Sequence, residues 1–362
     1  MVRARRLVAV GAALAVLLAA GCGGQPSAPV AGPTESATAS ATPSPTPTEP
    51  PTITLAFGGD VHFTGKTAAL LQDPATAFGP VAEIFRAADL AVVNLETAIT
   101  TGGRPEPKTY TFRAPPSAFE AVKAAGLDAV SVANNHALDY GPPAFQDTLA
   151  AAKAAGVPLL GGGANAAEAY APRIFTVKGV TIALLGFSQI MIDWPSWHAT
   201  DTQAGIAMAG TPAQIERAAQ AVRAAKAQAD VVVVFMHWGQ ETNACPIQTQ
   251  KNAAQAFADA GATMIVGTHA HVLQGDGWLG RTYVAYGMSN FVWYSNSSIS
   301  NDTQVVRVTL TGSTITRTEL LPAVIDSRTG QPIPATGSQA DRIAKKFANL
   351  RGCTGLAAAP AV

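Results

Sequence analysis

The sequence predicts an α/β domain in which helices cover the outer faces of packed sheets. From Thr52 onward, short runs rich in β-branched residues alternate with alanine-rich stretches of helical length, an alternation typical of βαβ units. The strand-like runs are continuously apolar, which indicates burial on both faces. With 362 residues, 48% of them hydrophobic and 13% charged, the chain has enough apolar material for a large core.

The expected elements follow one another in two groups. In the first group, strands at 52–57, 90–95, 128–133, 158–161, 180–187, 230–236 and 263–267 alternate with helices at 79–88, 116–125, 143–155, 211–228 and 250–260. In the second, strands at 282–287, 304–311 and 314–321 come without long helices and predict an added antiparallel part. Together they define a domain at 52–325. Residues 326–362 are expected to be a surface tail with one helix near 338–349.

The N-terminal 51 residues are predicted to precede the folded domain. Three arginines come before an apolar run at 7–20 that is short for a bilayer span. Small residues precede Cys22, a pattern that resembles the lipobox of bacterial lipoproteins. Residues 1–22 are therefore expected to be a lipoprotein signal peptide that leaves Cys22 lipidated; an ordinary secretory signal is the alternative. Residues 23–51, rich in Pro, Ser and Thr, predict a disordered tether.

These features predict an extracytoplasmic protein, attached by its lipid to the cytoplasmic membrane. Outside the cytoplasm, Cys245 and Cys353 can form a stable disulfide, which would tie the tail to the loop after the strand at 230–236. Two unpaired thiols are the alternative. The formal net charge is zero, so no basic field predicts a nucleic-acid partner.

Polar side chains gather at the ends of the expected strands, and five of the six histidines are among them. In open α/β sheets, ligands bind outside the carboxyl ends of the strands, so these side chains are expected to converge. Imidazole, carboxylate and amide oxygen together suit Mn, Fe or Zn. Taken singly, each motif also fits a turn, a surface pair or a core histidine. The set comprises Asp60, His62, Asn94, Glu96, Asn134, Asn135, His136, His237, His269 and His271.

Six motifs stand in order along the chain: 58-GGDVH-62, 94-NLE-96, 133-ANNHALDYG-141, 236-MHWGQE-241, 267-GTHAH-271 and 290-NFV-292. In this order they resemble the bacterial capsule-synthesis family CapA, which is linked to poly-γ-glutamate and belongs to the calcineurin-like metallophosphoesterase superfamily. The resemblance covers about residues 52–325. It implies a four-layer αββα sandwich with a site for two divalent metal ions at the C-terminal strand ends.

The resemblance also implies a role for each motif residue. Asp60, His62 and His271 would bind the first metal ion, Glu96 would bridge both ions, and Asn135, His237 and His269 would bind the second. His136 would act as general acid or transition-state stabiliser, with Asp139 fixing its ring. Three motifs depart from the usual pattern, one of them by Ser289 in place of the glycine that usually precedes Asn290-Phe291. Asn94-Leu95-Glu96 replaces the usual Gly-Asp-x-x-Asp, and Ala137 stands where an acid usually follows Asn-His.

Three functions are weighed for such a chain. The first is a metal-dependent hydrolase acting on a phosphoester or on an envelope polymer such as poly-γ-glutamate. The second is a non-catalytic assembly or anchoring factor that positions a membrane-bound polymer synthase. The third, a solute-binding lipoprotein, would have two lobes and would give no reason for histidines at strand ends. The segment 189–198, with Trp194, Trp197 and His198, is expected either to cover the site or to form a buried aromatic plug.

Overall fold

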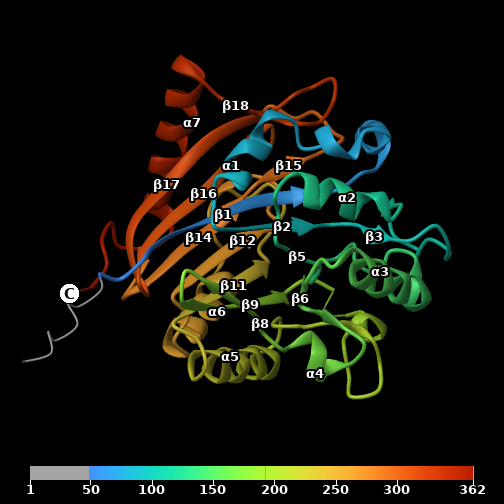
Figure 1. Cartoon of the computed structure of the whole chain (residues 1–362), viewed down its shortest axis with the longest axis horizontal. Helices are drawn as coiled ribbons and strands as arrows, with labels where there is room; N and C mark the ends of the chain where they lie inside the picture. Colours follow the sequence, from blue (N-terminus) through green and yellow to red (C-terminus); the bar gives the residue numbers. More distant parts are fainter. Residues whose placement is uncertain (1–48, 192, 362) are drawn as a thin grey trace, which may run out of the picture. The chain divides into compact units, whose positions relative to one another are not determined.

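Two sheets pack face to face in the computed structural model, which describes residues 49–191 and 193–361 (Figure 1). The larger sheet has eight strands in the order β18-β17-β16-β1-β2-β5-β6, with β15 also paired to β1. Within it, β1, β2, β5 and β6 run parallel, and β16 to β18 form an antiparallel part that includes the predicted strands 304–311 and 314–321. The third strand predicted for this part, 282–287, lies instead in the second sheet, where it pairs parallel with the strand at 264–268. Its strands are β1 (Thr52–Val61), β2 (Leu90–Leu95), β5 (Ala129–Ser131), β6 (Leu159–Leu160), β15 (Asn290–Val292), β16 (Asp302–Thr311), β17 (Thr314–Ile325) and β18 (Pro332–Pro334).

The second sheet has six strands in the order β13-β14-β12-β11-β9-β8. Its centre is parallel, and antiparallel partners close both edges. The strands are β8 (Arg173–Val177), β9 (Val180–Ser188), β11 (Val231–His237), β12 (Met264–Thr268), β13 (Leu273–Leu279) and β14 (Thr282–Met288). Two short ladders pair β3 (Ala98–Ile99) with β4 (Arg113–Ala114), and β7 (Gly162–Gly163) with β10 (Gly205–Ile206).

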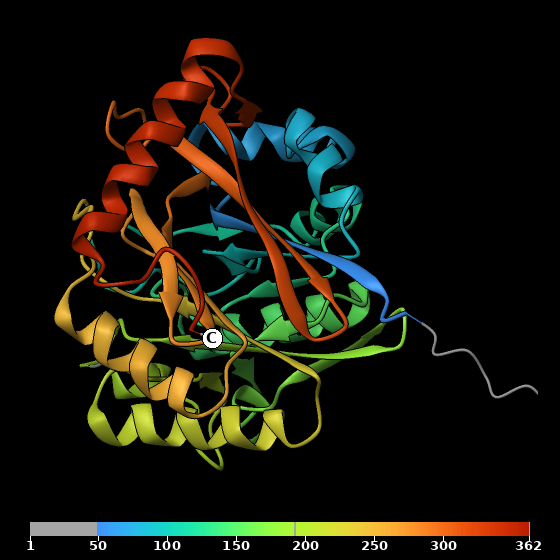
Figure 2. The same ribbon diagram turned by 90° about the vertical axis from the view of Figure 1, so that its left-hand side faces the viewer.

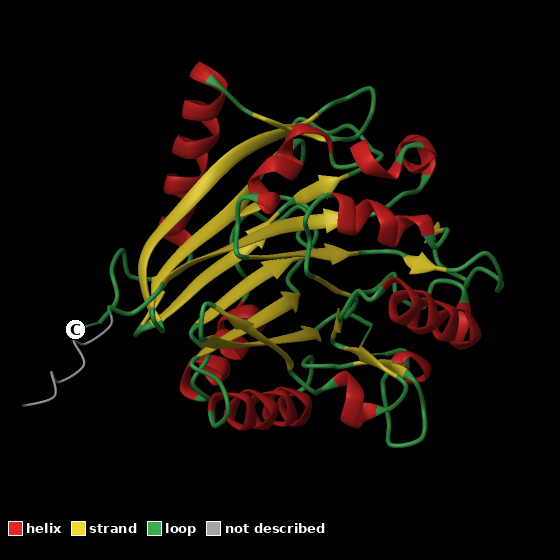
Figure 3. Cartoon of the chain, in the orientation of Figure 1, coloured by secondary structure: helices red, strands yellow, loops and turns green. Residues whose placement is uncertain are grey.

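Helices cover the outer faces of both sheets, as Figure 3 shows by colour. Five of the six helices expected from the sequence match a helix to within a few residues; 79–88 becomes a 3₁₀ turn followed by the short α1. The helices are α1 (Ala82–Arg86), α2 (Ser117–Ala124), α3 (Gly141–Ala155), α4 (Ala166–Ala169), α5 (Pro212–Lys226), α6 (Gln248–Asp259) and α7 (Gly337–Leu350). The 3₁₀ turns are η1 (Gly65–Gln72), η2 (Pro74–Thr76), η3 (Gly79–Val81), η4 (Pro195–Trp197) and η5 (Arg351–Cys353).

Three apolar clusters define four layers. The central cluster lies between the sheets and joins residues of β1 and β2 to residues of β9, β11 and β12, for example Phe57 and Phe235. A second cluster packs α1, α2 and α3 on the larger sheet, and a third packs α5 and α6 on the smaller one. Each fully buried Val, Ile or Phe contributes roughly 1.5–3 kcal/mol. The predicted four-layer αββα sandwich is confirmed.

The segment expected to be a surface tail packs on the domain. β18 pairs with β17, and α7 buries Ile343 and Phe347 against Leu273. Figure 2 shows α7 along one side of the sheets. The predicted helix at 338–349 corresponds to α7.

The predicted signal peptide 1–22, with Cys22, and all but the last three residues of the predicted tether 23–51 lie outside the described residues. Within the described ranges, no helix combines the length and the apolar character needed to cross a membrane.

Candidate metal centre

The carboxyl ends of strands from both sheets meet at one place. Parallel pairing sets Asp60 opposite Asn94 in the larger sheet, and His237 opposite Thr268 in the smaller sheet. The backbone N–H of His269 donates to Asp60 Oδ2 across 3.2 Å and so joins the ends of the two sheets. The predicted convergence of polar residues at the strand ends is therefore present, because the register of each ladder places them at the same edge.

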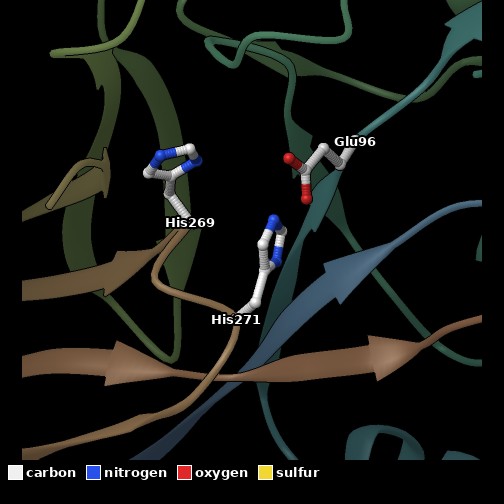
Figure 4. A group of neighbouring side chains, drawn as sticks. All are labelled: Glu96, His269 and His271. Carbon is white, nitrogen blue, oxygen red and sulfur yellow. The ribbon is translucent and has the colours of Figure 1, made fainter. Parts of the chain in front are cut away.

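Two groups of side chains are close enough to hold a metal ion. Asp60, Glu96 and His237 each offer a ligand atom within 4.8 Å of the others, and so do Glu96, His269 and His271. Figure 4 shows the second group, with Glu96 entering from the end of β2 and both histidines from the segment after β12. Glu96 is common to both groups.

Glu96 provides the test of whether a cation fits. Within the described part of the chain, neither of its buried carboxylate oxygens has a hydrogen-bond partner. Burial, and then the negative charge of Asp60, raises the pKa of Glu96 well above its ordinary value. A buried carboxylate without a partner is costly. Because a divalent ion would remove both the repulsion and the lack of partners, the residues fit a metal.

Other atoms at the site share this property. The Nδ1 atoms of His269 and His271 and the Oδ1 atom of Asn290 are buried without a hydrogen-bond partner among the described residues. The Nδ1 atom of His271 lies 3.2 Å from Asp60 Oδ2. Burial lowers the pKa of His237 to about 3 and also lowers the pKa of His269 well below its usual range. Neutral imidazoles have the lone pairs that a metal requires.

Asn135 and His237 contact each other directly beside Glu96. Asn135 Oδ1 lies 2.5 Å from His237 Nε2, and Glu96 Oε1 lies 3.4 Å from the same nitrogen. On the other side of the ring, the Thr268 hydroxyl lies 3.1 Å from Nδ1 and can accept its proton. Nε2 would offer a lone pair to an ion only in the tautomer that places the proton on Nδ1, where it faces Thr268 and where Asn94 Nδ2 does not donate.

The two asparagines at the strand ends form a supporting network. Asn94 Nδ2 donates to Asp60 Oδ1 at 2.7 Å and also lies 3.2 Å from His237 Nδ1. Asn134 Nδ2 donates to Asn94 Oδ1 at 3.0 Å and to the carbonyl of Leu95 at 2.9 Å. Such contacts behind the ligands fix their orientation.

His136 and Asp139 form a second functional unit beside the ligands. His136 Nδ1 lies 2.5 Å from Asp139 Oδ2, and the ring face stacks on Phe112 with centroids 4.0 Å apart. The turn before α3 brings positions 136 and 139 together, which compensates for Ala137 at the usual acid position. His136 Nε2 points toward the ligands, 3.9 Å from Glu96 Oε1. Burial raises the pKa of Asp139 to about 7, although Lys108 and the N–H of Phe112 oppose this rise.

His62 shares one property with the other predicted ligands, since its Nε2 is buried without a hydrogen-bond partner among the described residues, but it differs from them in its surroundings. It belongs to neither group, and its ring packs between Phe112 and Trp293 at centroid distances of 4.4 and 4.3 Å. Its Nδ1 accepts from the backbone N–H of Thr64 at 3.1 Å. This bond assigns the proton of the neutral ring to Nε2, so His62 presents a donor where a ligand needs a lone pair. Its role as a ligand stays a prediction.

The segment 100–112 supplies residues to which the sequence analysis assigns no role, although Phe112 belongs to the stretch 112-FRAPP-116 that also resembles the family. Lys108 Nζ donates to Asp139 Oδ1 at 2.5 Å and to the backbone carbonyl of Asn135. Phe112 stacks on both His62 and His136. This segment has no strand or helix periodicity, so the sequence gives no signal for where these side chains point.

The aromatic segment at 189–198 lies against the same region. Trp197 is fully buried, and its ring lies 4.9 Å from Lys108 Nζ. Trp194 is half-buried and packs on Trp197. Of the two expectations for this segment, Trp197 fits the buried plug, while its contact with Lys108 links the plug to the site.

The backbone is unusual where the ligands leave the sheets. His269 and His271 have φ values of 87° and 55°, and Ser289 has 67°. Non-glycine residues in this region are strained, and such strain clusters at functional sites. Gly59 permits the close approach of β1 and Ser289, because an added Cβ would lie 1.9 Å from the Ser289 carbonyl oxygen.

The C-terminal segment supports the loop that follows His237. Cys245 and Cys353 form a disulfide across a sequence separation of 108 residues. In the same loop, the N–H of Thr242 donates to the carbonyl of Ala270 at 2.8 Å, between the two histidines of the His-x-His motif. The tail and the metal centre are thus connected through one loop.

Comparison with known proteins finds relatives in one family. The family described as bacterial capsule synthesis protein PGA_cap matches residues 54–295. The chain is 31% identical over 259 residues to the PGA biosynthesis protein CapA of Bacillus subtilis, covering 71% of this chain and 67% of that protein. It is 32% identical over 231 residues to the capsule biosynthesis protein CapA of Bacillus anthracis, covering 64% and 55%. A probable polyglutamine synthesis accessory protein of Mycobacterium tuberculosis is 31% identical, covering 57% and 53%. The chain thus spans between about half and two thirds of these relatives' lengths.

Among solved structures, a hypothetical protein from Thermus thermophilus aligns with a TM-score of 0.48 at 16% identity, covering 75% of this chain and 98% of that one. A phosphatase of Mycoplasma pneumoniae aligns with a TM-score of 0.47 at 16% identity, covering 83% and 99%. Overlap at this level carries no conclusion about activity.

Proposed function

Because this chain belongs to the bacterial capsule synthesis protein PGA_cap family, part of the metallophosphoesterase-like superfamily, we propose that it is a metal-dependent hydrolase of capsule or poly-γ-glutamate synthesis. Its substrates would be phosphoester or envelope-polymer bonds. The observation that carries the proposal is Glu96, a buried carboxylate without a partner among the described residues that is shared by both candidate ligand groups. A residue in that position suits a bridge between two divalent ions.

The ligand assignment follows from the two groups. Glu96 would contact both ions, which we propose to be Mn, Fe or Zn. When bound, such ions polarise the scissile bond and lower the pKa of water. Asp60 and His271 would hold the first ion, with His62 as the less supported third ligand. The second ion would be held by Asn135, His237 and His269.

His136 would provide the proton chemistry. Its Nε2 atom faces the ligands, and Asp139 fixes the ring through Nδ1. Burial, followed by the nearby charge of Lys108, lowers the pKa of His136, whereas an anionic substrate beside Nε2 would favour the protonated ring. Protonated His136 would donate to the leaving-group oxygen, or would stabilise its developing charge.

A second function is favoured by a different observation. Two mycobacterial relatives are named as probable accessory proteins of polyglutamine synthesis. The chain would then bind metal for stability and position an envelope polymer or its membrane synthase without catalysing hydrolysis. The solute-binding reading has no support, since it does not account for the histidine cluster.

We propose an extracytoplasmic location for either function. The disulfide between Cys245 and Cys353 supports this, because such bonds persist in oxidising compartments. Lipidation at Cys22 would then hold the chain at the cytoplasmic membrane. Labelling with a radioactive fatty acid, compared between the unaltered chain and Cys22→Ser, tests the anchor.

Two adjacent substitutions test the hydrolase proposal. Protein purified without chelators is analysed for bound metals and assayed on an aryl phosphodiester and a γ-glutamyl peptide. We expect Asn135→Ala to lose metal together with turnover. We expect His136→Ala to keep nearly all its metal while turnover falls about 100-fold or more. Bound metal with no turnover of either substrate in the unaltered chain would favour the accessory function, and retained turnover in His136→Ala would remove His136 from the mechanism.

A further inference from the structure

We infer that Lys108 is a positioning residue that holds the His136–Asp139 pair in its working orientation. This inference rests on the proposed function, since it assigns His136 the proton chemistry. Lys108 lies in the irregular segment between β3 and β4, and its side chain is 14% exposed. Its Nζ donates to Asp139 Oδ1 and to the backbone carbonyl of Asn135. One ammonium group therefore contacts both the acid of the pair and the backbone of a predicted ligand.

The donors of Lys108 are already engaged inside the protein. An ammonium group has three N–H donors. Two are directed to the oxygens of Asn135 and Asp139, and the charge lies 4.9 Å from the centre of the Trp197 ring. A cation over an aromatic face is stabilised there. Two of the three donors of Lys108 are therefore used inside the protein, which favours a positioning role over substrate binding.

Both carboxylate oxygens of Asp139 are fixed from the same segment. Lys108 holds Oδ1, and the N–H of Phe112 donates to Oδ2 at 2.6 Å. The same Oδ2 faces His136 Nδ1, and the Phe112 ring stacks on the imidazole. The carboxylate therefore cannot rotate about its long axis without breaking a buried contact. Loss of Nζ would release Oδ1 and leave Asp139 held through Oδ2 alone, so the direction of the imidazole would be less firmly fixed.

A role through His136 makes a specific kinetic prediction. Lys108→Met keeps the aliphatic length and removes the ammonium group. With the aryl phosphodiester and saturating metal, we expect kcat to fall about 10- to 100-fold, as for other contacts behind a functional site. KM should stay within about twofold, because the two hydrogen bonds that are lost go to Asn135 and Asp139 and not to the substrate. In a double-mutant cycle, Lys108→Met combined with His136→Ala should be no slower than His136→Ala alone.

Two kinetic outcomes would overturn the inference. One is a higher KM at unchanged kcat, which would make Lys108 a substrate ligand. The other is an equal loss of kcat in the His136→Ala background, which would show that Lys108 acts independently of His136. The matched control is Lys178→Met. Lys178 also bonds a carboxylate, at 2.8 Å from Asp89, and a backbone carbonyl, that of Thr52 at 3.2 Å, but at the opposite end of the strands. The Lys178→Met substitution should leave kcat and KM unchanged.

A second readout does not depend on turnover. The short contact between His136 Nδ1 and Asp139 predicts a far-downfield proton resonance in ¹⁵N-histidine NMR, assigned by its loss in His136→Ala. We expect Lys108→Met to shift this resonance upfield or remove it, whereas Lys178→Met should not. An unchanged resonance would overturn the inference. If the unaltered chain hydrolyses neither substrate, the proposed function fails and this resonance alone decides on Lys108. If Lys108→Met does not fold, Lys108→Arg replaces it, because the guanidinium cannot reproduce the same point contacts.

Discussion

Two buried carboxylates, Glu96 at the candidate metal centre and Asp302 at the attachment of α7, have opposite environments. Asp302 accepts two hydrogen bonds from Arg342, at 2.8 and 2.6 Å, and one from Lys346 at 2.9 Å. Burial opposes ionisation of Asp302, but the bonds from Arg342 and Lys346 outweigh it and lower its pKa. Glu96 has no such partner among the described residues, and burial raises its pKa.

The difference is the one expected between a structural carboxylate and one that binds a ligand. The chain supplies Asp302 with two cations from one helix, so the group stabilises the attachment of α7. The lysine of the segment 100–112, Lys108, donates to Asp139 and not to Glu96. Leaving Glu96 without a partner costs stability, and chains keep such costs where a ligand from outside relieves them. Removing the charge should therefore raise the free energy of unfolding at Glu96, when no metal is bound, and lower it at Asp302.

The largest effect is expected at Glu96. Glu96→Gln keeps the shape of the side chain and removes its charge. We expect bound metal to be lost and turnover to fall at least about 100-fold, because even contacts behind a ligand are worth 10–100-fold. In the presence of a chelator, the free energy of unfolding should rise, because a repelled buried acid has been replaced by a neutral group. Elemental analysis, turnover and chemical denaturation measure the three quantities.

The opposite signs for function and stability make this test demanding. A Glu96→Gln chain that retained its metal would contradict the role of Glu96 as a shared ligand. A metal-free Glu96→Gln chain less stable than the unaltered one would mean that Glu96 has a structural partner after all. Either result would mean that Glu96 does not differ from Asp302 in the way proposed above.

A smaller effect, on stability alone, is expected at Asp302. Asp302→Asn removes the charge that Arg342 and Lys346 share. The free energy of unfolding should fall by about 1.5–3 kcal/mol, the range for hydrogen bonds to charged groups. It should not reach the larger cost of a fully buried pair, because the side chains of Arg342 and Lys346 are 54% and 33% exposed and can turn to water.

Metal content and turnover should not change in Asp302→Asn. Glu83→Gln is the matched control, since Glu83 pairs with Arg86 on the surface of α1, where ion pairs contribute little. It should cause no measurable change in stability. A loss of bound metal in Asp302→Asn would show that the two regions are coupled, and the comparison would fail.

The elements that the sequence predicts best are those with continuous apolar runs. β9, β11 and β12 are examples, since a short and continuously apolar run predicts a strand that is buried on both faces. β8 and β13 were not predicted. β8 is an edge strand whose residues alternate between half-buried and exposed. β13 buries Gln274 and Asp276, which become acceptable only through distant partners, Gln250 for the first and Arg351 for the second.

The candidate site divides in a similar way. Asp60, His237 and the His-x-His pair follow apolar strands directly, so strand order and register alone bring them together. Lys108 and Phe112 lie in an irregular segment whose path depends on tertiary contacts. The sequence therefore predicts the ligands better than it predicts the residues that position His136.

The comparison becomes sharper when the pH is lowered. Asp302 has a folded-state pKa below its ordinary value of 3.8, so its stabilising contribution is complete above that value and is lost as the pH falls through the folded-state pKa. The stability difference between the unaltered chain and Asp302→Asn should be constant near pH 7 and should shrink toward about pH 3. This change with pH cannot exceed the effect of Asp302→Asn on stability at pH 7. It is therefore the smallest of the three effects predicted for Glu96 and Asp302.

Urea denaturation of both chains at each pH measures this difference, with chelator present so that metal binding does not contribute. Taking the difference removes the titration of all other carboxylates that the two chains share. Added salt should reduce it only in part, since Asp302 is buried although its partners are half-exposed. A difference that stayed constant down to about pH 3 would mean that the Asp302 carboxylate contributes through packing and not through its charge. The contrast between the charge environments of Asp302 and Glu96 would then have no effect on stability.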